Sequence, residues 1–181
     1  MNKPSLIVVT GRPASGKSTL AHLLAKEIKC PLIARDELKE GYINTLGVRH
    51  DQLDKDAAWH IYRLFFETIN LLIAKNISLI AEAAFQDHLW KPQLLHLQDK
   101  AEIRIIICEI KPDLAKTRFE HRLLANPDRH KFHGDNQHKK NGGLQTDTYV
   151  PVDMDVPTLR VDTTHQYTPG IQQIVEFAKL R

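Results

Sequence analysis

The chain has 181 residues, of which 42% are hydrophobic and 26% charged, and its formal net charge is +3. This is enough apolar material for one globular domain of ordinary size, and so small a charge excess indicates neither a nucleic-acid coat nor a polybasic membrane anchor. Cys30 and Cys108 lie far apart without a CxxC pairing, which argues against a disulfide scaffold or a thiolate zinc site. The apolar run at 6–9 is too short for a signal-peptide core, and no run is long enough to span a membrane. We therefore expect a soluble, cytoplasmic protein with no membrane partner.

Short β-branched runs alternate with helical stretches along the chain. The runs at 5–9, 32–34, 77–81, 103–108 and 158–161 predict strands, and the middle ones are nearly continuous in Ile, Leu and Val. Such runs are typical of a parallel sheet covered on both faces. Apolar residues keep helical spacing between these strands, first over 20–28 and then over 57–72, in a long helix that we start near Asp51. This order predicts a three-layer α/β fold in a single domain, 1–181, with right-handed crossovers.

Two stretches depart from this pattern. Residues 36–48 are polar, contain two glycines and predict a short helix or a loop. Residues 126–151 are rich in His, Lys, Gly, Asn and Asp and show no periodicity. A stretch of this length is long for a structureless connection, so it is either a functional lid or a disordered insertion.

The clearest motif follows the first predicted strand. Residues 11–18 read G-R-P-A-S-G-K-S and fit G-x-x-x-x-G-K-[ST], in the strand-loop-helix context that this pattern requires. Gly11 and Gly16 permit backbone angles and close approaches that a Cβ would block, so successive N–H groups converge on phosphate oxygens. Lys17 then reaches the β- and γ-phosphates, and the Ser18 hydroxyl ligates Mg²⁺.

Other nucleotide-binding classes lack support in the sequence. The GTPase patterns D-x-x-G and N-K-x-D do not occur, and neither does the transporter signature L-S-G-G-Q. The chain is also too short for an AAA+ motor core with its helical lid domain. The compact P-loop kinases, which move a phosphoryl group to a second substrate, are the class that remains.

Two carboxylates follow predicted strands. Asp36 comes directly after the second strand, where it should face the γ-phosphate and accept a hydroxyl proton; alternatively it only caps the short helix that follows. Glu82 ends the apolar run at 78–82, as in a Walker B strand. It could hold a Mg²⁺-bound water, orient the acceptor, serve as the base in place of Asp36, or be a plain acid at the edge of the strand.

Three arginines surround the start of the irregular stretch. Arg118 and Arg122 are four residues apart on a predicted helix that begins near Asp113, so we expect them on one face, and Arg129 follows. Guanidinium groups on a mobile lid can neutralise charge on the transferring phosphoryl group, although solvated surface arginines are the alternative.

The remaining candidate residues give weaker indications of a functional role. Histidines 121, 130, 133 and 138 have no nearby cysteine and no spacing typical of a structural zinc site, so we do not predict a metal there. Trp59, Tyr62, Phe65 and Phe66 keep helical spacing and predict packing rather than a base-stacking platform. Residues 162–164 either border the adenine or cap the final helix.

Taken together, these residues resemble the small P-loop kinases often described as AAA-type ATP-binding proteins, a group that includes chloramphenicol phosphotransferase, the zeta toxins and the kinase domain of polynucleotide kinase. The matching segments are 11–21, Ala34-Arg35-Asp36-Glu37, Glu82-Ala83-Ala84-Phe85, and Arg118 with Arg122. The chain departs from many relatives in carrying Ala14 where glycine is common and in its His-rich segment after Arg129.

The resemblance implies a five-stranded parallel sheet in the order 2-3-1-4-5 with a lid at about 113–151. It implies that Asp36 is the general base and that Arg118 and Arg122 belong to the lid. The nucleotide contacts that we expect are Gly11, Arg12, Pro13, Ala14, Ser15, Gly16, Lys17, Ser18, Thr19, Arg118 and Arg129, with Ser18 and Glu82 at the metal.

The leading hypothesis is therefore an ATP-dependent, Mg²⁺-requiring phosphotransferase that acts on a hydroxyl of a small molecule. A 5′-hydroxyl nucleic-acid kinase is a rival that the near-neutral charge disfavours. A nucleotide-binding switch with little turnover is a second rival, but such a module needs no base. The acceptor and the oligomeric state stay open.

Overall fold

The computed structural model describes residues 3–54, 56–133 and 149–179. Its five strands form one sheet in which every neighbouring pair is parallel, in the order β2-β3-β1-β4-β5. The strands are β1 (Ser5–Gly11), β2 (Leu32–Ala34), β3 (Leu79–Glu82), β4 (Glu102–Glu109) and β5 (Thr158–Asp162). The fold class and strand order predicted from the sequence are thus confirmed.

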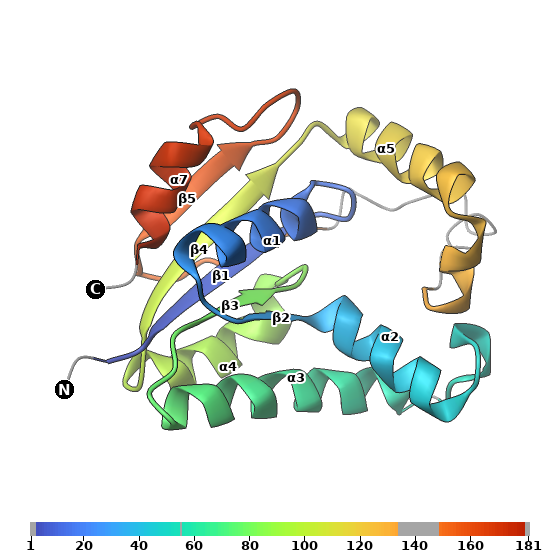
Figure 1. The fold of residues 1–181 in the computed structure, drawn as a ribbon, viewed down its shortest axis with the longest axis horizontal. Helices are drawn as coiled ribbons and strands as arrows, with labels where there is room; N and C mark the ends of the chain where they lie inside the picture. The colour runs from blue at the N-terminus through green and yellow to red at the C-terminus, as the bar shows by residue number, and fades with distance from the viewer. Residues whose placement is uncertain (1–2, 55, 134–148, 180–181) are drawn as a thin grey trace.

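Helices cover both faces of this sheet, with α1 and α7 on one side and α3 and α4 on the other (Figure 1). The helices are α1 (Lys17–Ile28), α2 (Arg35–Leu46), α3 (Ala57–Ala74), α4 (Asp87–Gln98), α5 (Pro112–Ala125) and α7 (Ile171–Ala178). Two short 3₁₀ segments, η1 (His50–Gln52) and η2 (Pro127–Lys131), complete the described elements. None of the described helices is long and apolar enough to cross a membrane.

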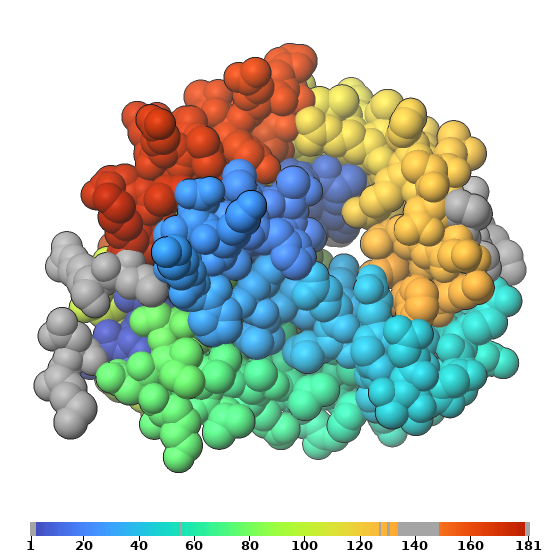
Figure 2. All heavy atoms as spheres, in the orientation of Figure 1, coloured from blue at the N-terminus to red at the C-terminus, as the bar shows by residue number. Residues whose placement is uncertain are grey.

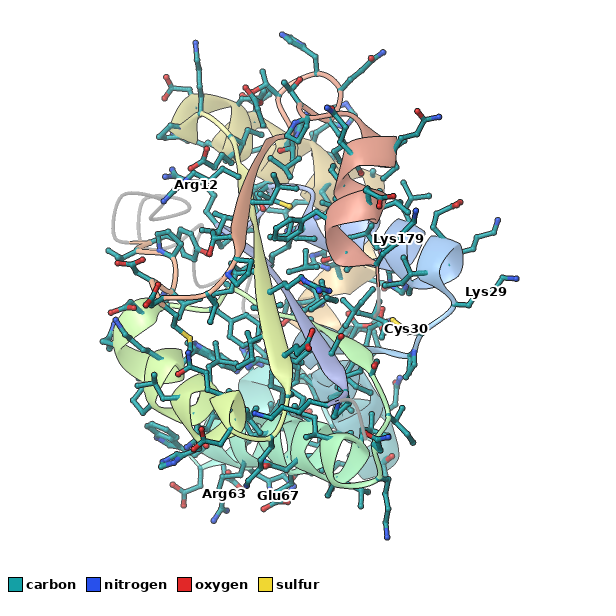
Figure 3. The ribbon with its side chains drawn as sticks, turned by 90° about the vertical axis from the view of Figure 1, so that its left-hand side faces the viewer. Arg12, Lys29, Cys30, Arg63, Glu67 and Lys179 are labelled. Atoms are coloured by element: carbon teal, nitrogen blue, oxygen red, sulfur yellow. The ribbon has the colours of Figure 1, made fainter. Side chains whose placement is uncertain are left out.

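The central strand β1 divides the core in two. Leu6 and Val8 pack into the cluster under α3 and α4, whereas Ile7 and Val9 pack into the cluster under α1 and α7. All four side chains are fully buried because successive residues of a strand point to opposite faces and both faces are covered. On the outer side of α3, the exposed Arg63 and Glu67 point away from the sheet (Figure 3).

The cysteines agree with the absence of a disulfide scaffold. Cys30 and Cys108 are free thiols, and both are buried. Burial raises the pKa of the Cys30 thiol to about 11 and that of Cys108 to about 12. Neither thiol is therefore a nucleophile near neutral pH.

Two predicted boundaries were wrong. The long helix begins at Ala57 rather than near Asp51, because the Asp54 carboxylate accepts a hydrogen bond from the Asp56 N–H and forms a turn just before the helix. The third strand begins at Leu79 rather than Ile77, because Asn76 takes a left-handed conformation and turns the chain there. The polar stretch at 36–48 forms helix α2, which ends at a left-handed Gly47.

The predicted lid is described in part. Helix α5 leaves the carboxyl end of β4, and the chain turns back through η2 toward the far end of α2 (Figure 1). Figure 2 shows a hollow between α1, α2 and α5 on this side of the molecule. Residues 134–148 of the predicted lid lie outside the described residues. At its other end, Val150 accepts a hydrogen bond from the Asp87 N–H, which fixes this part of the chain to the start of α4.

The junction of β1 with the following loop requires a glycine. A Cβ on Gly11 would lie 2.6 Å from the backbone oxygen of Cys108 on β4 and 2.4 Å from Ser15 Oγ. The backbone of β4 cannot move aside as a flexible side chain can, so there is no space for a larger residue at position 11.

We therefore predict that Gly11→Ala lowers the free energy of unfolding by about 1–3 kcal/mol. Gly41→Ala is the matched control, because its added Cβ meets nothing within 4 Å and lies inside helix α2, where alanine is favoured by up to about 1 kcal/mol. Urea denaturation of the three proteins measures both effects. Equal stability of Gly11→Ala and the wild type would contradict this close packing.

Candidate active site

The loop between β1 and α1 is built to surround an anion. Ala14 and Gly16 have φ values of +62° and +82°, and Ser15 N–H donates to Arg12 O at 3.1 Å, which closes a tight turn. Gly16 occupies the N-cap of α1, so no side chain accepts from the first N–H groups of this helix. Uncapped N–H groups and the positive end of the helix dipole favour a phosphate at this point.

A long-range contact holds the loop in place. Thr163 Oγ1 lies 2.7 Å from the backbone oxygen of Ser15 and 3.0 Å from that of Glu109, and Thr163 N–H also donates to Glu109 O at 3.0 Å. Thr163 thereby joins the end of β5 to the loop after β1. The sequence had offered residues 162–164 as a cap for the final helix, but that helix begins at Ile171 and its N-cap is Gly170.

Most of the predicted catalytic residues line one cavity of about 460 Å³ beside this loop. They come from the start of α1, the start of α2, the end of β3, and the lid elements α5 and η2. The predicted residues around this cavity are Pro13, Ala14, Lys17, Ser18, Asp36, Glu82, Arg122 and Arg129. Side chains from five elements therefore meet in one cavity.

Lys17, Ser18 and Glu82 lie together at the phosphate-loop end of the cavity, where Glu82 is buried and Ser18 is exposed. Lys17 Nζ lies 3.7 Å from Glu82 Oε1, and the Ser18 side chain is near enough to the Glu82 carboxylate to lower its pKa. Glu82 is 3% exposed, and this burial raises its pKa even though Lys17 and Ser18 act in the opposite direction. A hydroxyl and a carboxylate side by side are oxygen ligands of the kind that Mg²⁺ prefers.

Ser18 and Glu82 suit a metal ion whose other ligands are water and the phosphates of a bound nucleotide. Among the residues that the structure describes, no group of three or more His, Cys, Asp or Glu side chains is placed to hold a metal ion. Mg²⁺ commonly keeps water ligands and takes one or two protein oxygens beside substrate phosphates. Ser18 and Glu82 can supply these one or two protein oxygens.

Asp36 lies nearer to solvent than Glu82. It is the second residue of α2, whose N-cap is Ala34, so it does not occupy the capping position that the sequence left open. Its side chain is 49% exposed, with Oδ1 3.6 Å from Arg35 Nη1. Desolvation raises the pKa of Asp36, but the surrounding positive charges, led by Lys17, outweigh it and bring the pKa below its usual value. Asp36 is therefore ionised at neutral pH.

The two lid arginines that we expected to act together line different cavities. The Arg118 guanidinium donates to the backbone oxygens of Thr163 and Thr164, each at 2.8 Å, and lines a second cavity of about 550 Å³ that includes Gly16 and Thr19. Arg122 lies over the Phe119 ring, 5.5 Å from its centroid, and lines the first cavity. Helix α5 therefore runs between the two cavities.

The structure adds residues that the sequence reasoning missed. Arg35, Lys39 and Trp90 also line the first cavity, and the Arg35 guanidinium lies 6.0 Å from the centroid of the Trp90 ring. His133 Nε2 is 2.7 Å from Glu40 Oε1 and links the part of the lid that follows η2 to α2. Arg35 had a signal, since it precedes Asp36 in the chain, whereas the other contacts join distant segments that no local pattern relates.

The histidines predicted to be without a metal are only partly described. Burial and the nearby Arg129 lower the pKa of His133, so its ring is neutral at neutral pH and hydrogen-bonds Glu40. His138 lies outside the described residues.

Comparison with known proteins identifies the family. An AAA domain family matches residues 6–140, more than half of the chain. The chain belongs to this family. No curated protein sequence matches the chain.

Several solved structures with the same fold are named as kinases. A candidate kinase from Chloroflexus aurantiacus J-10-fl is 25% identical, with a TM-score of 0.79 over 98% of this chain and 95% of that one. An APS kinase from Mycobacterium tuberculosis, in complex with AMPPNP and APS, is 14% identical, with a TM-score of 0.64 over 98% and 99%. A gluconokinase from Sinorhizobium meliloti 1021 is 18% identical, with a TM-score of 0.54 over 98% and 91%. The resemblance to P-loop kinases is confirmed.

The two carboxylates predict opposite responses to pH. The pKa of Asp36 is lowered on folding, so its ionisation stabilises the protein above its usual pKa and that contribution is lost as the pH falls. The pKa of Glu82 is raised, so its contribution is present in acid and is lost as the pH rises. As the pH rises from about 2 to 5, the Tm of Asp36→Asn minus that of the wild type should become more negative. As the pH rises from about 4 to 7, the same difference for Glu82→Gln should become more positive.

Thermal melts of the three proteins in matched buffers measure these slopes. Two slopes of the same sign would show that the two carboxylates do not differ in environment as described.

Proposed function

We propose that the protein is an ATP-dependent kinase that transfers the γ-phosphoryl group to a hydroxyl of a small molecule. The observation that carries the proposal is the single cavity in which the phosphate-binding loop, Lys17, Asp36, Glu82 and Arg122 meet. A module that only binds nucleotide needs the loop but not a carboxylate base beside it.

The loop and Lys17 bind the phosphates of the nucleotide. The N–H groups at the start of α1 donate to phosphate oxygens, and the Lys17 ammonium moves from Glu82 toward the β- and γ-phosphates. Ser18 and Glu82 would hold Mg²⁺ beside these phosphates. When bound, this ion neutralises negative charge that develops on the phosphates.

Asp36 is the general base. The acceptor oxygen forms a bond to the γ-phosphorus while the bond from that phosphorus to the β–γ bridging oxygen breaks, and the hydroxyl proton passes to the Asp36 carboxylate. ADP keeps the electron pair of the broken bond. The low pKa of Asp36 keeps the carboxylate ionised before each transfer, and its exposed side chain can reach an acceptor in the cavity.

The arginines have separate tasks. Arg122 and Arg129 line the first cavity, where they neutralise charge spread over the transferring phosphoryl group. Arg118 lines the second cavity beside Gly16 and Thr19, and there it contacts the nucleoside part of ATP. The hydrogen bonds from Arg118 to Thr163 and Thr164 hold the wall of that second cavity.

A small acceptor agrees with the size of the site and with the neighbours. The cavity is about 460 Å³, which suits a small molecule together with the terminal phosphate. Two of the solved neighbours are a gluconokinase and an APS kinase, whose names describe small-molecule substrates.

Nucleotide binding is the first test of this function. We predict that Mg·ATP at millimolar concentration raises the Tm of the wild type, because a ligand that binds the folded state stabilises it by mass action. Lys17→Ala should lose most of this shift, whereas Lys26→Ala, an exposed position on the same helix, should keep it. The absence of any shift in the wild type would overturn the proposal.

The base is tested by Asp36→Asn. This variant keeps the size of the side chain but loses the carboxylate, so we predict an unchanged Kd for Mg·AMPPNP and a kcat for ADP release lowered by roughly 10²-fold or more. Coupled ADP assays with an accepted alcohol measure this ratio. An unchanged kcat in Asp36→Asn, with a large loss in Glu82→Gln, would give the role of base to Glu82.

A further inference from the structure

The acceptor side of the catalytic cavity carries a pair of basic side chains with no task in binding the nucleotide. We propose that the acceptor is a small hydroxylated anion, and that Arg35 and Lys39 of α2 bind its anionic group. The proposal rests on the kinase function proposed above and narrows the class of acceptor. Carboxylate and phosphate groups share the required chemistry.

The position of Arg35 and Lys39 distinguishes the two ends of the catalytic cavity. Arg35 and Lys39 line both the catalytic cavity and an adjoining cavity of about 250 Å³, whereas Lys17 and Ser18 line only the first of these two. The phosphate end of the site is therefore at the loop, and the opposite end is at α2. Residues four apart lie on one face of a helix, so the two cations lie next to each other along this end.

The acids around the cavity already have basic neighbours. Among the described side chains, Glu82 lies 3.7 Å from Lys17, Glu40 lies 2.7 Å from His133, and Glu37 lies 2.6 Å from His22. The fourth acid, Asp36, is the proposed base and lies 3.6 Å from the Arg35 guanidinium. Five lysine and arginine side chains line the cavity against these four carboxylates, so its balance of charge favours an anion over a cation.

The Arg35 guanidinium is held in a position where it can bind an anionic group. It lies against the Trp90 ring, and Trp90 is itself buried among Phe65, Phe66 and Phe85. Its Nε is buried and has no hydrogen-bond partner among the described residues. Its Nη1 forms an ion pair with Asp36 Oδ1 at 3.6 Å, which is longer than a hydrogen bond.

A donor left without a partner costs free energy. A bound carboxylate or phosphate would supply the missing acceptor, because its two oxygens can accept from two nitrogens of the planar guanidinium at once. Since Arg35 directly precedes Asp36 in the chain, an anion held there also places the hydroxyl of the same molecule within reach of the base.

The enclosure of this end favours a small molecule over a polynucleotide. His133, which follows η2, is 7% exposed and hydrogen-bonds Glu40 of α2, so the lid meets α2 beyond the pair of cations. A nucleic-acid strand requires a groove that continues past the site. A small molecule whose anionic group is bound by Arg35 and Lys39 does not require such a groove.

The proposal is tested with matched neutral and anionic acceptors on the full chain saturated with Mg·AMPPNP, which keeps the probes off the phosphate loop. The probes are glucose, gluconate and glucose 6-phosphate, which share their hydroxyls but differ in charge, and titration calorimetry measures their Kd. We expect at least one of the two anions to bind about tenfold or more tightly than glucose. Comparison of gluconate with glucose 6-phosphate shows whether a carboxylate or a phosphate is preferred.

Variants assign the effect to the pair. Arg35→Gln and Lys39→Gln should each raise the Kd of the preferred anion, and its KM in an ADP-release assay with Mg·ATP, by about tenfold, while the KM for ATP stays within about twofold. Arg35→Lys should recover part of the loss, because it restores the charge but not the planar fork. Arg63→Gln is the matched control, since it removes the same charge from the exposed face of α3 (Figure 3). If Arg35→Gln does not fold, Lys39→Gln carries the test.

Several results would overturn the proposal. Glucose binding as tightly as both anions, no binding by either anion, or an unchanged Kd in the folded Gln variants would each do so, as would phosphorylation of a 5′-hydroxyl oligonucleotide but of neither anion. In all of these cases binding of Mg·AMPPNP still supports nucleotide use. A chain that does not bind Mg·AMPPNP fails at the earlier step, and both proposals fall together.

Discussion

The tight turn at residues 11–16 is the constraint on which the other parts of the site depend. Gly11 is pressed against the backbone of β4, and Gly16 takes a left-handed conformation at the first step into α1. Such a turn is costly for the backbone unless its surroundings hold it. Thr163 provides much of that support by joining Ser15 and Glu109. The phosphate site is therefore fixed by β4 and β5 as well as by its own sequence.

The strand order then decides which side chains meet at the loop. Strand β1 lies between β3 and β4, and Val9 is in register with Glu82. Ala34 of β2 is in register with the same residue, so the carboxyl ends of three parallel strands lie at one edge of the sheet. Side chains that follow these ends must converge there. This is why Lys17, Asp36 and Glu82 line one cavity although the first and the last are 65 positions apart in the chain.

The parts of this arrangement that follow from local rules could be predicted from the sequence. Apolar runs indicated the five strands, and the rule that parallel strands present their ends at one crevice placed Asp36 and Glu82. The separation of Arg118 from Arg122 could not be predicted, because helical spacing puts them on one face without saying that Thr163 and Thr164 occupy one side of α5. The contact of Arg35 with Trp90 joins α2 to α4, and no spacing along the chain relates them.

The contrast between the two carboxylates bears on their roles. Glu82 is enclosed beside Lys17 and Ser18, and its burial raises the pKa, so it needs a bound cation to stay ionised at low cost. Asp36 is half-exposed among positive charges, and its pKa is lowered without any ligand. A group that is ionised before the substrates arrive can accept a proton in each cycle, whereas a group whose charge is favoured by a cation is better suited to hold Mg²⁺. This difference in environment supports the proposed roles of Asp36 as the base and Glu82 as the metal ligand. Because Arg35 precedes Asp36 in the chain, the proposed acceptor contact lies next to the proposed base.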